Sequence, residues 1–252
     1  NLEGGTVLPS LLRWAKLHNN KLYLTILVSS ENSRSKAKER FSNFIKKNAC
    51  SNLLFFNINT YHEFDASKIQ DCAIIAIPET SHLKTIEFLS KVTKDIICVK
   101  PFTQNITQVK EANKIAHQNN INIFIDFHKR FDEANIEFIK NATNKTYSKG
   151  LFTFSYGQKS EMPLNYFKKW SFLSNPFQYL APHYLHIIFS ILEKYEIDLS
   201  SIKVDGNVNF LNFPNKTKLI SILSCNLNLY NNENYFLVNS ICNWMEPKSS
   251  PF

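Results

Sequence analysis

The sequence lacks several features that would assign it to a specialised class of protein. It contains no apolar run of 18 residues, so we expect no membrane span. Its five cysteines form no Cys-x-x-Cys pair and their number is odd. Cys72 and Cys98 lie inside apolar runs and are interpreted as small core residues, and a reducing cytoplasm is the location that fits best. There are no internal repeats or low-complexity tracts.

What is present is typical of a globular protein. The 252 residues are 44% hydrophobic and 20% charged, and this length is enough for one large domain or two ordinary ones. The net charge of +8 indicates an anionic partner, either nucleic acid or a phosphate-bearing cofactor or substrate. Because the basic residues are scattered along the chain, we interpret most of them as a solvated surface and expect no nucleic-acid partner.

The first 127 residues alternate between strand-like and helix-like segments. The apolar run Asp71–Ile77 lacks alternation, as in a strand that is covered on both faces of a parallel sheet. The other expected strands are Lys21–Val28, Leu53–Asn57, Asp95–Val99 and Ile121–Phe127, and the expected helices are Thr6–His18, Ser33–Asn48, His82–Val92 and Thr107–Gln118. This rhythm predicts an α/β fold with a Rossmann-type doubly wound parallel sheet over residues 1–127.

Beyond Lys129 the strands follow one another more directly. The expected elements are helices at Asp132–Asn141 and Phe177–Lys194 and β-rich runs at Gly150–Gly157, Ile202–Leu211, Lys218–Leu229 and Tyr235–Ile241. They predict an α+β domain with a mostly antiparallel open sheet over residues 128–252. We further expect the first strand of the doubly wound fold to precede Asn1, and the second domain to be truncated at its C-terminus.

Four segments together resemble the Gfo/Idh/MocA oxidoreductases, the group of glucose–fructose oxidoreductase and inositol dehydrogenase. They are Asp71–His82, a strand with a Pro-containing loop and a His; Val99-Lys100-Pro101, which matches Glu-Lys-Pro except at its first residue; Ile125–Asp132; and Gln178–His186. The resemblance implies a nicotinamide cofactor, NAD or NADP. It implies a sugar, nucleotide-sugar or polyol as the substrate, and homo-oligomers that pair through the C-terminal sheet.

Cofactor-binding residues are expected at several strand ends. Gly4 and Gly5 before a helix could admit phosphate oxygens to backbone N–H groups, or form a plain tight turn. Ser29, Ser30 and Arg34 suit the 2′-phosphate of NADP, which we favour slightly, whereas Glu31 would suit the ribose hydroxyls of NAD. The serines could also simply cap a helix. The resemblance adds cofactor contacts at Ile77, Pro78, His82, Lys100 and Pro101.

Lys100 is one of two expected catalytic residues. It follows an apolar strand, where the crevice of a parallel sheet lies, and its ammonium could bind a substrate oxygen and stabilise developing negative charge. Without the match to Glu-Lys-Pro it would be read as a surface lysine. The Glu of that motif is Val99 in this chain, so its role is either absent or supplied by another residue.

His183 is the other expected catalytic residue, by the position that it takes in the resemblance. A lone His on an apolar helix is more often structural, but oxidation of an alcohol needs a base for the hydroxyl proton, and imidazole suits that work near neutral pH. Many family members have Asp four residues before and three residues after this His. Tyr179 and His186 occupy those positions here. They could bind substrate, or reflect a different substrate or lost activity.

Arg130 is a further candidate, at the expected join between the two domains. It could bind a carboxylate or phosphate of the substrate, or it could pair with Asp132 or cap a helix. His183 and His186 at i, i+3 lack a third metal ligand, so we expect no metal. The hypothesis is an NAD(P)-dependent oxidoreductase, and the alternative is a non-catalytic, cofactor-binding regulator or scaffold on the same fold.

Overall fold

The computed structural model describes residues 7–159, 168–197, 202–212, 218–230 and 234–246. Gly4 and Gly5, the expected phosphate turn, lie outside these residues. The chain divides into two compact units, Asn1–Lys68 and Ile69–Phe252, which are described separately below. The domain boundary expected near Phe127 stays a prediction.

The first unit pairs two parallel strands with two helices. Its elements are α1 (Val7–His18), β1 (Leu22–Val28), α2 (Glu31–Asn48) and β2 (Leu54–Thr60), and β1 pairs with β2 from Leu22↔Leu54 onward. The apolar stripe of α1 packs Leu8, Leu12 and Ala15 against Phe44 of α2. Helix α2 begins where Ser30 Oγ accepts the backbone N–H of Ser33 over 3.2 Å, which satisfies one of the free donors at a helix start.

The second unit opens with three parallel strands in the order β3-β4-β5. The elements are β3 (Ala73–Ile75), the 3-10 helix η1 (Glu79–Ser81), α3 (His82–Leu89), β4 (Asp95–Val99), α4 (Ile106–Asn119) and β5 (Asn122–Asp126). Strand β4 is central, and it buries Ile96 and Cys98 completely. Because the strands are parallel, they all end at the same edge, and the polar residues that follow them gather there.

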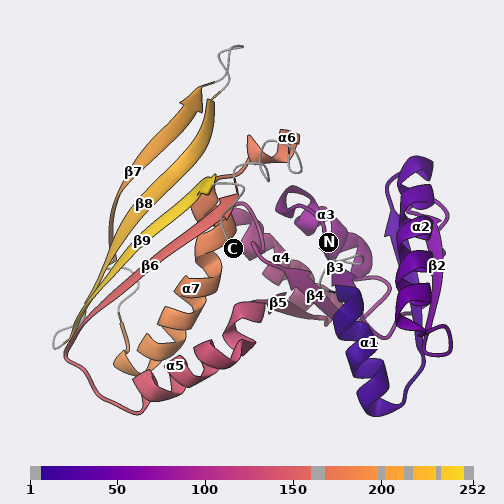
Figure 1. Ribbon diagram of the computed structural model, residues 1–252, viewed down its shortest axis with the longest axis horizontal. Coiled ribbons are helices and arrows are strands. Elements are labelled where there is room, and N and C mark those ends of the chain that lie inside the picture. Colours follow the sequence, from indigo (N-terminus) through magenta and orange to yellow (C-terminus); the bar gives the residue numbers. More distant parts are fainter. Residues whose placement is uncertain (1–6, 160–167, 198–201, 213–217, 231–233, 247–252) are drawn as a thin grey trace. The chain divides into compact units, whose positions relative to one another are not determined.

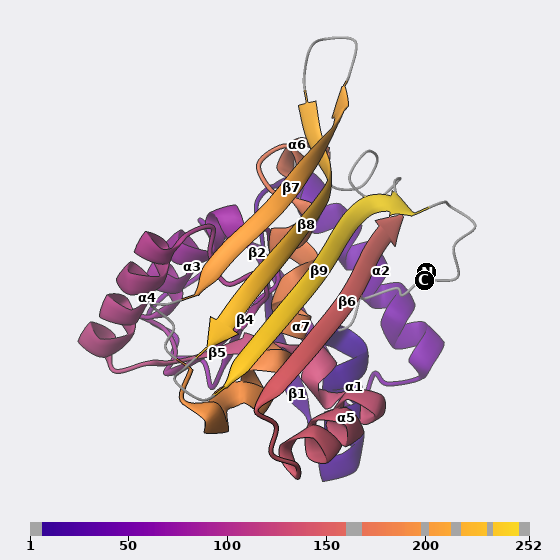
Figure 2. The ribbon, with the colours of Figure 1, turned by 90° about the vertical axis from the view of Figure 1, so that its left-hand side faces the viewer.

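A four-stranded sheet in the order β6-β9-β8-β7 forms the rest of the second unit. The elements are η2 (His128–Phe131), α5 (Glu133–Thr143), β6 (Lys149–Lys159), α6 (Lys168–Ser171), α7 (Pro176–Leu192), η4 (Glu193–Tyr195), β7 (Lys203–Asn212), β8 (Lys218–Tyr230) and β9 (Tyr235–Glu246). The β7–β8 and β8–β9 pairs are antiparallel and β6–β9 is parallel. Helix α7 covers one face of this sheet (Figure 1), and Figure 2 shows the strands in front with α7 behind them.

The contact between α7 and the sheet is the main apolar core of this region. Ile188 and Leu192 of α7 pack on Leu229, Phe236 and Val238 of the two central strands. The alternate positions of β6 and β9 face the other way, and there Leu151, Tyr235 and Ile241 are exposed. The sheet is therefore covered on one face and open on the other, as the sequence predicts.

The predicted fold class is confirmed: parallel strands with helices come first, and a mostly antiparallel sheet follows. Two details differ. Strand β3 spans only Ala73–Ile75 instead of Asp71–Ile77, because the last residues of that apolar run already turn into the loop that carries Pro78. Among the described residues, β1–β2 and β3–β4–β5 form two separate ladders.

Candidate active site

Three charged side chains lie where β3, β4 and β5 end. Glu79 follows β3, Lys100 follows β4 and Asp126 closes β5. The register pairs Ile75 with Cys98 and Val99 with Asp126, so Lys100 follows the central strand, with the loop that carries Glu79 on one side and Asp126 on the other. The carboxyl edge of a parallel sheet is where such folds bind ligands.

Lys100 is held by helix α7. Its Nζ donates to the backbone carbonyl of Tyr179 over 2.5 Å and lies 3.9 Å from the centre of the Tyr179 ring. Pro182 lies inside α7, and because proline has no N–H, it cannot donate to the carbonyl of Gln178, the residue before Tyr179. Burial lowers the pKa of Lys100 to about 8, although Glu79 and then Asp126 oppose the fall.

His183 is almost completely buried, with 2% of its surface exposed. Its Nδ1 has no hydrogen-bond partner within the described residues, and its ring meets that of His128 edge-on at 4.4 Å between centroids. Burial, followed by the nearby charge of Lys100, lowers the pKa of His183 to about 3. The ring is therefore neutral at physiological pH.

Phe127 and Arg130 fix the position of His186. The Phe127 ring stacks on the His186 ring at 4.2 Å between centroids, and Nη1 of Arg130 lies 3.2 Å from His186 Nε2. Arginine can only donate, so Nε2 is the acceptor and the His186 proton lies on Nδ1. Burial and then Arg130 lower the pKa of His186. The structure thus joins Arg130 to His186 and pairs Asp132 with Lys129 instead, at 3.0 Å.

His82 bridges the loops that follow β3 and β4. Its side chain is fully buried, Nε2 lies 2.7 Å from the carbonyl of Ile77, and Nδ1 lies 2.9 Å from the carbonyl of Phe102. Its side chain therefore holds together the two loops that carry Pro78 and Pro101. Cofactor binding by these residues stays a prediction, whereas the bridge is a feature of the fold.

At the end of β1, Arg34 is already paired with acidic side chains. Its guanidinium contacts Glu31 at 3.1 Å and also pairs with Glu63, and Glu63 in turn accepts from the backbone N–H of Thr60 over 2.8 Å. Ser30 serves as the helix cap, which is the alternative that the sequence left open, and Ser29 is exposed. A 2′-phosphate could reach this arginine only by competing with two carboxylates.

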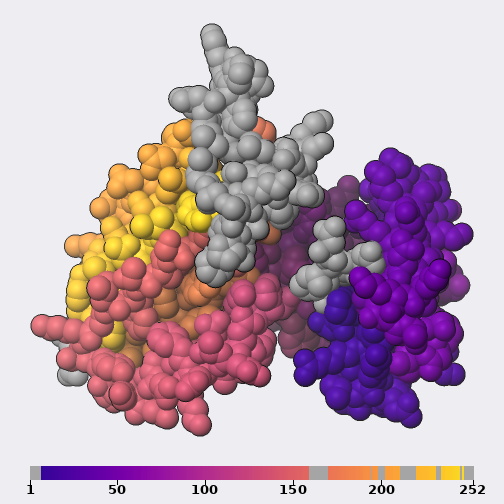
Figure 3. Space-filling model, in the orientation of Figure 1, coloured from indigo at the N-terminus to yellow at the C-terminus, as the bar shows by residue number. Residues whose placement is uncertain are grey.

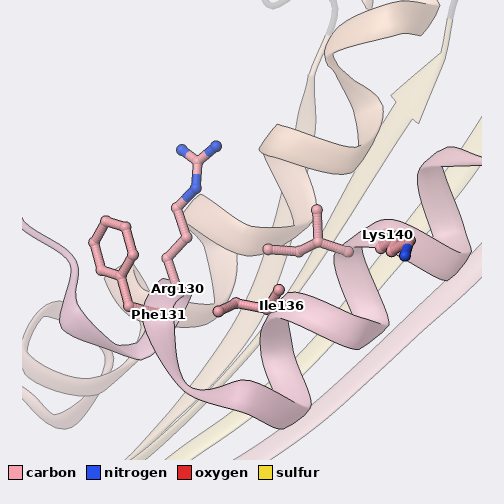
Figure 4. A pocket seen from close by; sticks show the side chains of 5 residues that line it. Arg130, Phe131, Ile136 and Lys140 are labelled. Atoms are coloured by element: carbon pink, nitrogen blue, oxygen red, sulfur yellow. The ribbon is translucent and has the colours of Figure 1, made fainter.

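An open hollow of about 310 Å³ lies beside η2 and α5. Figure 4 shows Arg130 and Phe131 on η2 and Ile136 and Lys140 on α5 around it. In the space-filling view α5 and the start of β6 form one continuous surface (Figure 3). The walls of the hollow are mostly apolar, with Arg130 and Lys140 as its cations, and Arg130 connects it to His186.

Two residues of the site were missed from the sequence. Glu79 is buried, with 3% of its surface exposed, and its Oε2 accepts from the indole Nε1 of Trp170 over 2.6 Å. An acidic residue one position after a strand-ending proline was a usable signal for Glu79. Trp170 gave none, because its segment has no periodicity that would predict its place.

Two other kinds of site are absent among the described residues. No group of three or more His, Cys, Asp or Glu side chains is arranged to hold a metal ion. No helix is long and apolar enough to cross a membrane. All five cysteines are free. Cys98 is buried, as expected for a core residue, whereas Cys72 is exposed, so its interpretation as a core residue was wrong.

Comparison with known proteins adds a family and a fold. Residues 9–127 match the model of an oxidoreductase family with an NAD-binding Rossmann fold. A probable dehydrogenase of Thermotoga maritima is similar, with 15% sequence identity, a TM-score of 0.64 and 92% of this chain covered. A myo-inositol 2-dehydrogenase of Lactobacillus plantarum has 14% identity, a TM-score of 0.62 and 90% coverage of this chain. An aldose-aldose oxidoreductase of Caulobacter crescentus has 12% identity, a TM-score of 0.64 and 90% coverage. The chain spans 65%, 71% and 72% of their respective lengths. No curated protein matches the sequence.

Proposed function

We propose that the protein is an oxidoreductase of the Gfo/Idh/MocA family, whose model matches residues 9–127, and that it moves a hydride between a nicotinamide cofactor and a hydroxyl or keto carbon of a sugar, nucleotide-sugar or polyol. One observation carries the proposal. A half-buried ammonium, Lys100, and a buried neutral imidazole with an unpartnered nitrogen, His183, belong to one cluster beside the carboxyl edge of β3–β5.

The two groups have complementary tasks. Lys100 is protonated at neutral pH, since its pKa of about 8 lies above 7, so it can donate to the reacting oxygen and stabilise negative charge there. His183 is neutral above about pH 3, so it can accept the hydroxyl proton during oxidation. The nicotinamide, when bound, accepts or returns the hydride.

The low pKa of His183 also fixes what happens to the proton that it accepts. The imidazolium is unstable beside Lys100, His128 and Lys129, which all lower its pKa. Protonated His183 is therefore short-lived and passes its proton on. The ring of His128 lies 4.4 Å from that of His183 between centroids and can accept the proton, and its side chain is half exposed to solvent. We propose His128 as the exit for the proton.

The end of β1 has groups that suit an adenosine ribose. The exposed carboxylate of Glu31 can accept from ribose hydroxyls, and the paired state of Arg34 supports NAD over NADP because a 2′-phosphate would meet Glu31 and Glu63. In this proposal the paired state of Arg34 outweighs the slight preference for NADP that Ser29, Ser30 and Arg34 indicate in the sequence, and we propose NAD as the cofactor.

The test is to measure turnover with a panel of sugars, inositols and nucleotide-sugars, using the absorbance of the reduced nicotinamide as the readout. We expect activity with at least one compound, and a loss of about 10²–10⁴-fold in kcat for His183→Asn, the range that removal of a general base produces. His117→Gln, an exposed substitution on α4, is the matched control. Full activity of His183→Asn would contradict the proposal.

The depressed pKa of His183 also favours a second candidate, because it makes this histidine a weak base. In that candidate the chain is a non-catalytic regulator or scaffold that binds the same cofactor. It predicts tight binding of NADH or NADPH without turnover of any compound in the panel. It also predicts that His183→Asn leaves the biological activity of the protein intact.

We further propose self-association through the open face of the β6–β9–β8–β7 sheet, where Leu151, Tyr235 and Ile241 are exposed. Light scattering of the protein and of an Ile241→Lys variant tests it, and an unchanged mass would refute it. The free cysteines support the cytoplasmic location proposed here.

A further inference from the structure

We propose that Glu79 is the positioning residue of Lys100: its buried carboxylate, anchored by Trp170, keeps the Lys100 ammonium charged and in place at the end of β4. The inference rests on the proposed function only in giving Lys100 a catalytic task. The link between the two side chains stands on the structure alone.

The surroundings of Glu79 leave its charge only partly compensated. Oε2 accepts one hydrogen bond, from Trp170, while Oε1 is buried without a hydrogen-bond partner in the described residues. Burying an ionised carboxylate is costly unless a cation lies nearby. The register places the end of β4, and with it Lys100, next to the loop that carries Glu79. Glu79 also acts on Lys100 through its charge, which raises the pKa of that lysine.

A chain of contacts joins the two charges through the aromatic side chains. Trp170 bonds to Glu79 and meets the ring of Tyr179 edge-on, with centroids 5.3 Å apart. Tyr179 in turn holds Lys100 with its carbonyl and its ring face. A shift of Glu79 would therefore move Trp170 and Tyr179, and with them the groups that contact the Lys100 ammonium. The carboxylate thus acts on Lys100 both through its charge and through this chain of contacts.

Several charged or titratable groups act on Lys100, and Glu79 is the strongest source of support for its charge. Burial disfavours the ammonium, and Glu79 opposes this more than Asp126 does. Lys100 and His128 both lower the pKa of His183, and Lys100 lowers that of His128. The physical reason for the ranking is exposure: Glu79 is 3% exposed, whereas 38% of the Asp126 side chain is in contact with solvent, which screens its charge.

The consequence is that Glu79 sets the charge state of Lys100 in the working range of pH. With a pKa of about 8, about nine-tenths of the Lys100 side chains are protonated at pH 7. An opposite charge in such a cluster raises the pKa of a lysine by roughly 1–3 units. Without Glu79 the amine would therefore lose its proton near neutrality, and with it the ability to donate to a substrate oxygen.

The experiment is an NMR titration of the full chain with ¹³Cε-labelled lysine, in which the Lys100 resonance is assigned by its absence in Lys100→Arg. We expect Glu79→Gln, which keeps an acceptor for Trp170 but removes the charge, to lower the midpoint of Lys100 by roughly one pH unit or more. Asp126→Asn should lower it less. Glu79→Asp should restore most of the wild-type value, and Glu133→Gln, exposed on α5, should leave it unchanged.

An unchanged Lys100 midpoint in Glu79→Gln, or a larger fall in Asp126→Asn, would overturn the proposal. These results do not depend on turnover, so they are separable from a failure of the proposed function. If Glu79→Gln does not fold, the free energies of unfolding of two Lys100→Met variants, with and without the second substitution Glu79→Gln, provide the test instead. Lys100→Met alone leaves the Glu79 carboxylate uncompensated, so we expect the Glu79→Gln/Lys100→Met double variant to be more stable than Lys100→Met. A double variant that is no more stable would refute the coupling.

Discussion

The His82 bridge makes the sharpest prediction about what holds the site together. We replace His82 by Leu, which fills a similar space but donates no hydrogen bond. A neutral imidazole carries one N–H, so the ring donates either to the carbonyl of Ile77 at 2.7 Å or to that of Phe102 at 2.9 Å, and the replacement removes that hydrogen bond. The side chain is 0% exposed, so water has little access to replace it.

The magnitude follows from the one hydrogen bond that is lost. A buried polar group that is left without its partner costs about 1–3 kcal/mol. The more apolar Leu side chain recovers part of this by its burial, up to about 1–2 kcal/mol. We expect a net loss of about 1 kcal/mol in the free energy of unfolding. For a unit of this size, that corresponds to a fall of roughly 2–4 °C in Tm.

The assay is thermal unfolding followed by circular dichroism, with His117→Leu as the control. His117 lies on α4 and is exposed, so its replacement should change Tm very little. If His82→Leu and His117→Leu unfold within about 1 °C of each other, the bridge contributes nothing and the reasoning is refuted. A loss of stability together with weaker cofactor binding would indicate that the bridge also shapes the loops with Pro78 and Pro101.

Two further predictions concern pH and cofactor choice. The pKa of His183 is about 3 in the folded protein, below its unperturbed value of about 6.5. As the pH falls, His183 is therefore protonated in the unfolded chain before it is protonated in the folded protein. Its contribution to stability is complete above pH 6.5 and declines as the pH falls towards 3. Urea unfolding at pH 7 and pH 4.5 should therefore show a smaller loss of stability for His183→Asn than for the wild type, and equal losses would contradict the burial argument. The Glu31→Gln/Glu63→Gln double variant releases Arg34, so the ratio of NADPH to NADH affinity, measured by fluorescence titration, should rise relative to the wild type and to Glu39→Gln. An unchanged ratio would mean that Arg34 does not contact the 2′-phosphate position.

The sequence predicted those parts of the fold that depend on local pattern. The helical spacing of apolar residues and the length of each segment identified α2 and α4 to within two residues at each end. Both helices have sharp ends, because each begins at a side-chain cap, Ser30 or Asn105, and ends at a residue with a left-handed backbone conformation. The β-rich runs also identified β6 to β9. The parallel pairing of β6 with β9 could not be predicted, because it joins strands far apart in the chain and neither carries a signal for its partner.

The motifs named some residues of the candidate site but not their environment. Lys100, Tyr179 and His183 were identified by motif and lie in one cluster, whereas Glu79 and Trp170 were not identified, and the roles of all five stay predictions. The pKa values, the pairing of Arg34 and the bridge made by His82 depend on burial and on tertiary neighbours, which no local pattern encodes. Val99 replaces the acidic residue of the Glu-Lys-Pro motif, and the buried carboxylate near Lys100 comes instead from the adjacent loop, as Glu79.

The parallel pairing of β6 and β9 has a consequence for how the protein is made. Strand β6 ends at Lys159 and β9 ends at Glu246, so β6 leaves the ribosome roughly 90 residues before its partner strand is complete. At 5–20 residues per second this interval is on the order of 10 s. Antiparallel neighbours β7, β8 and β9 can pair as soon as they emerge, whereas β6 is an unpaired edge during that time, and such edges are prone to aggregation. Chaperone demand should therefore be greatest while the polypeptide is between these two lengths.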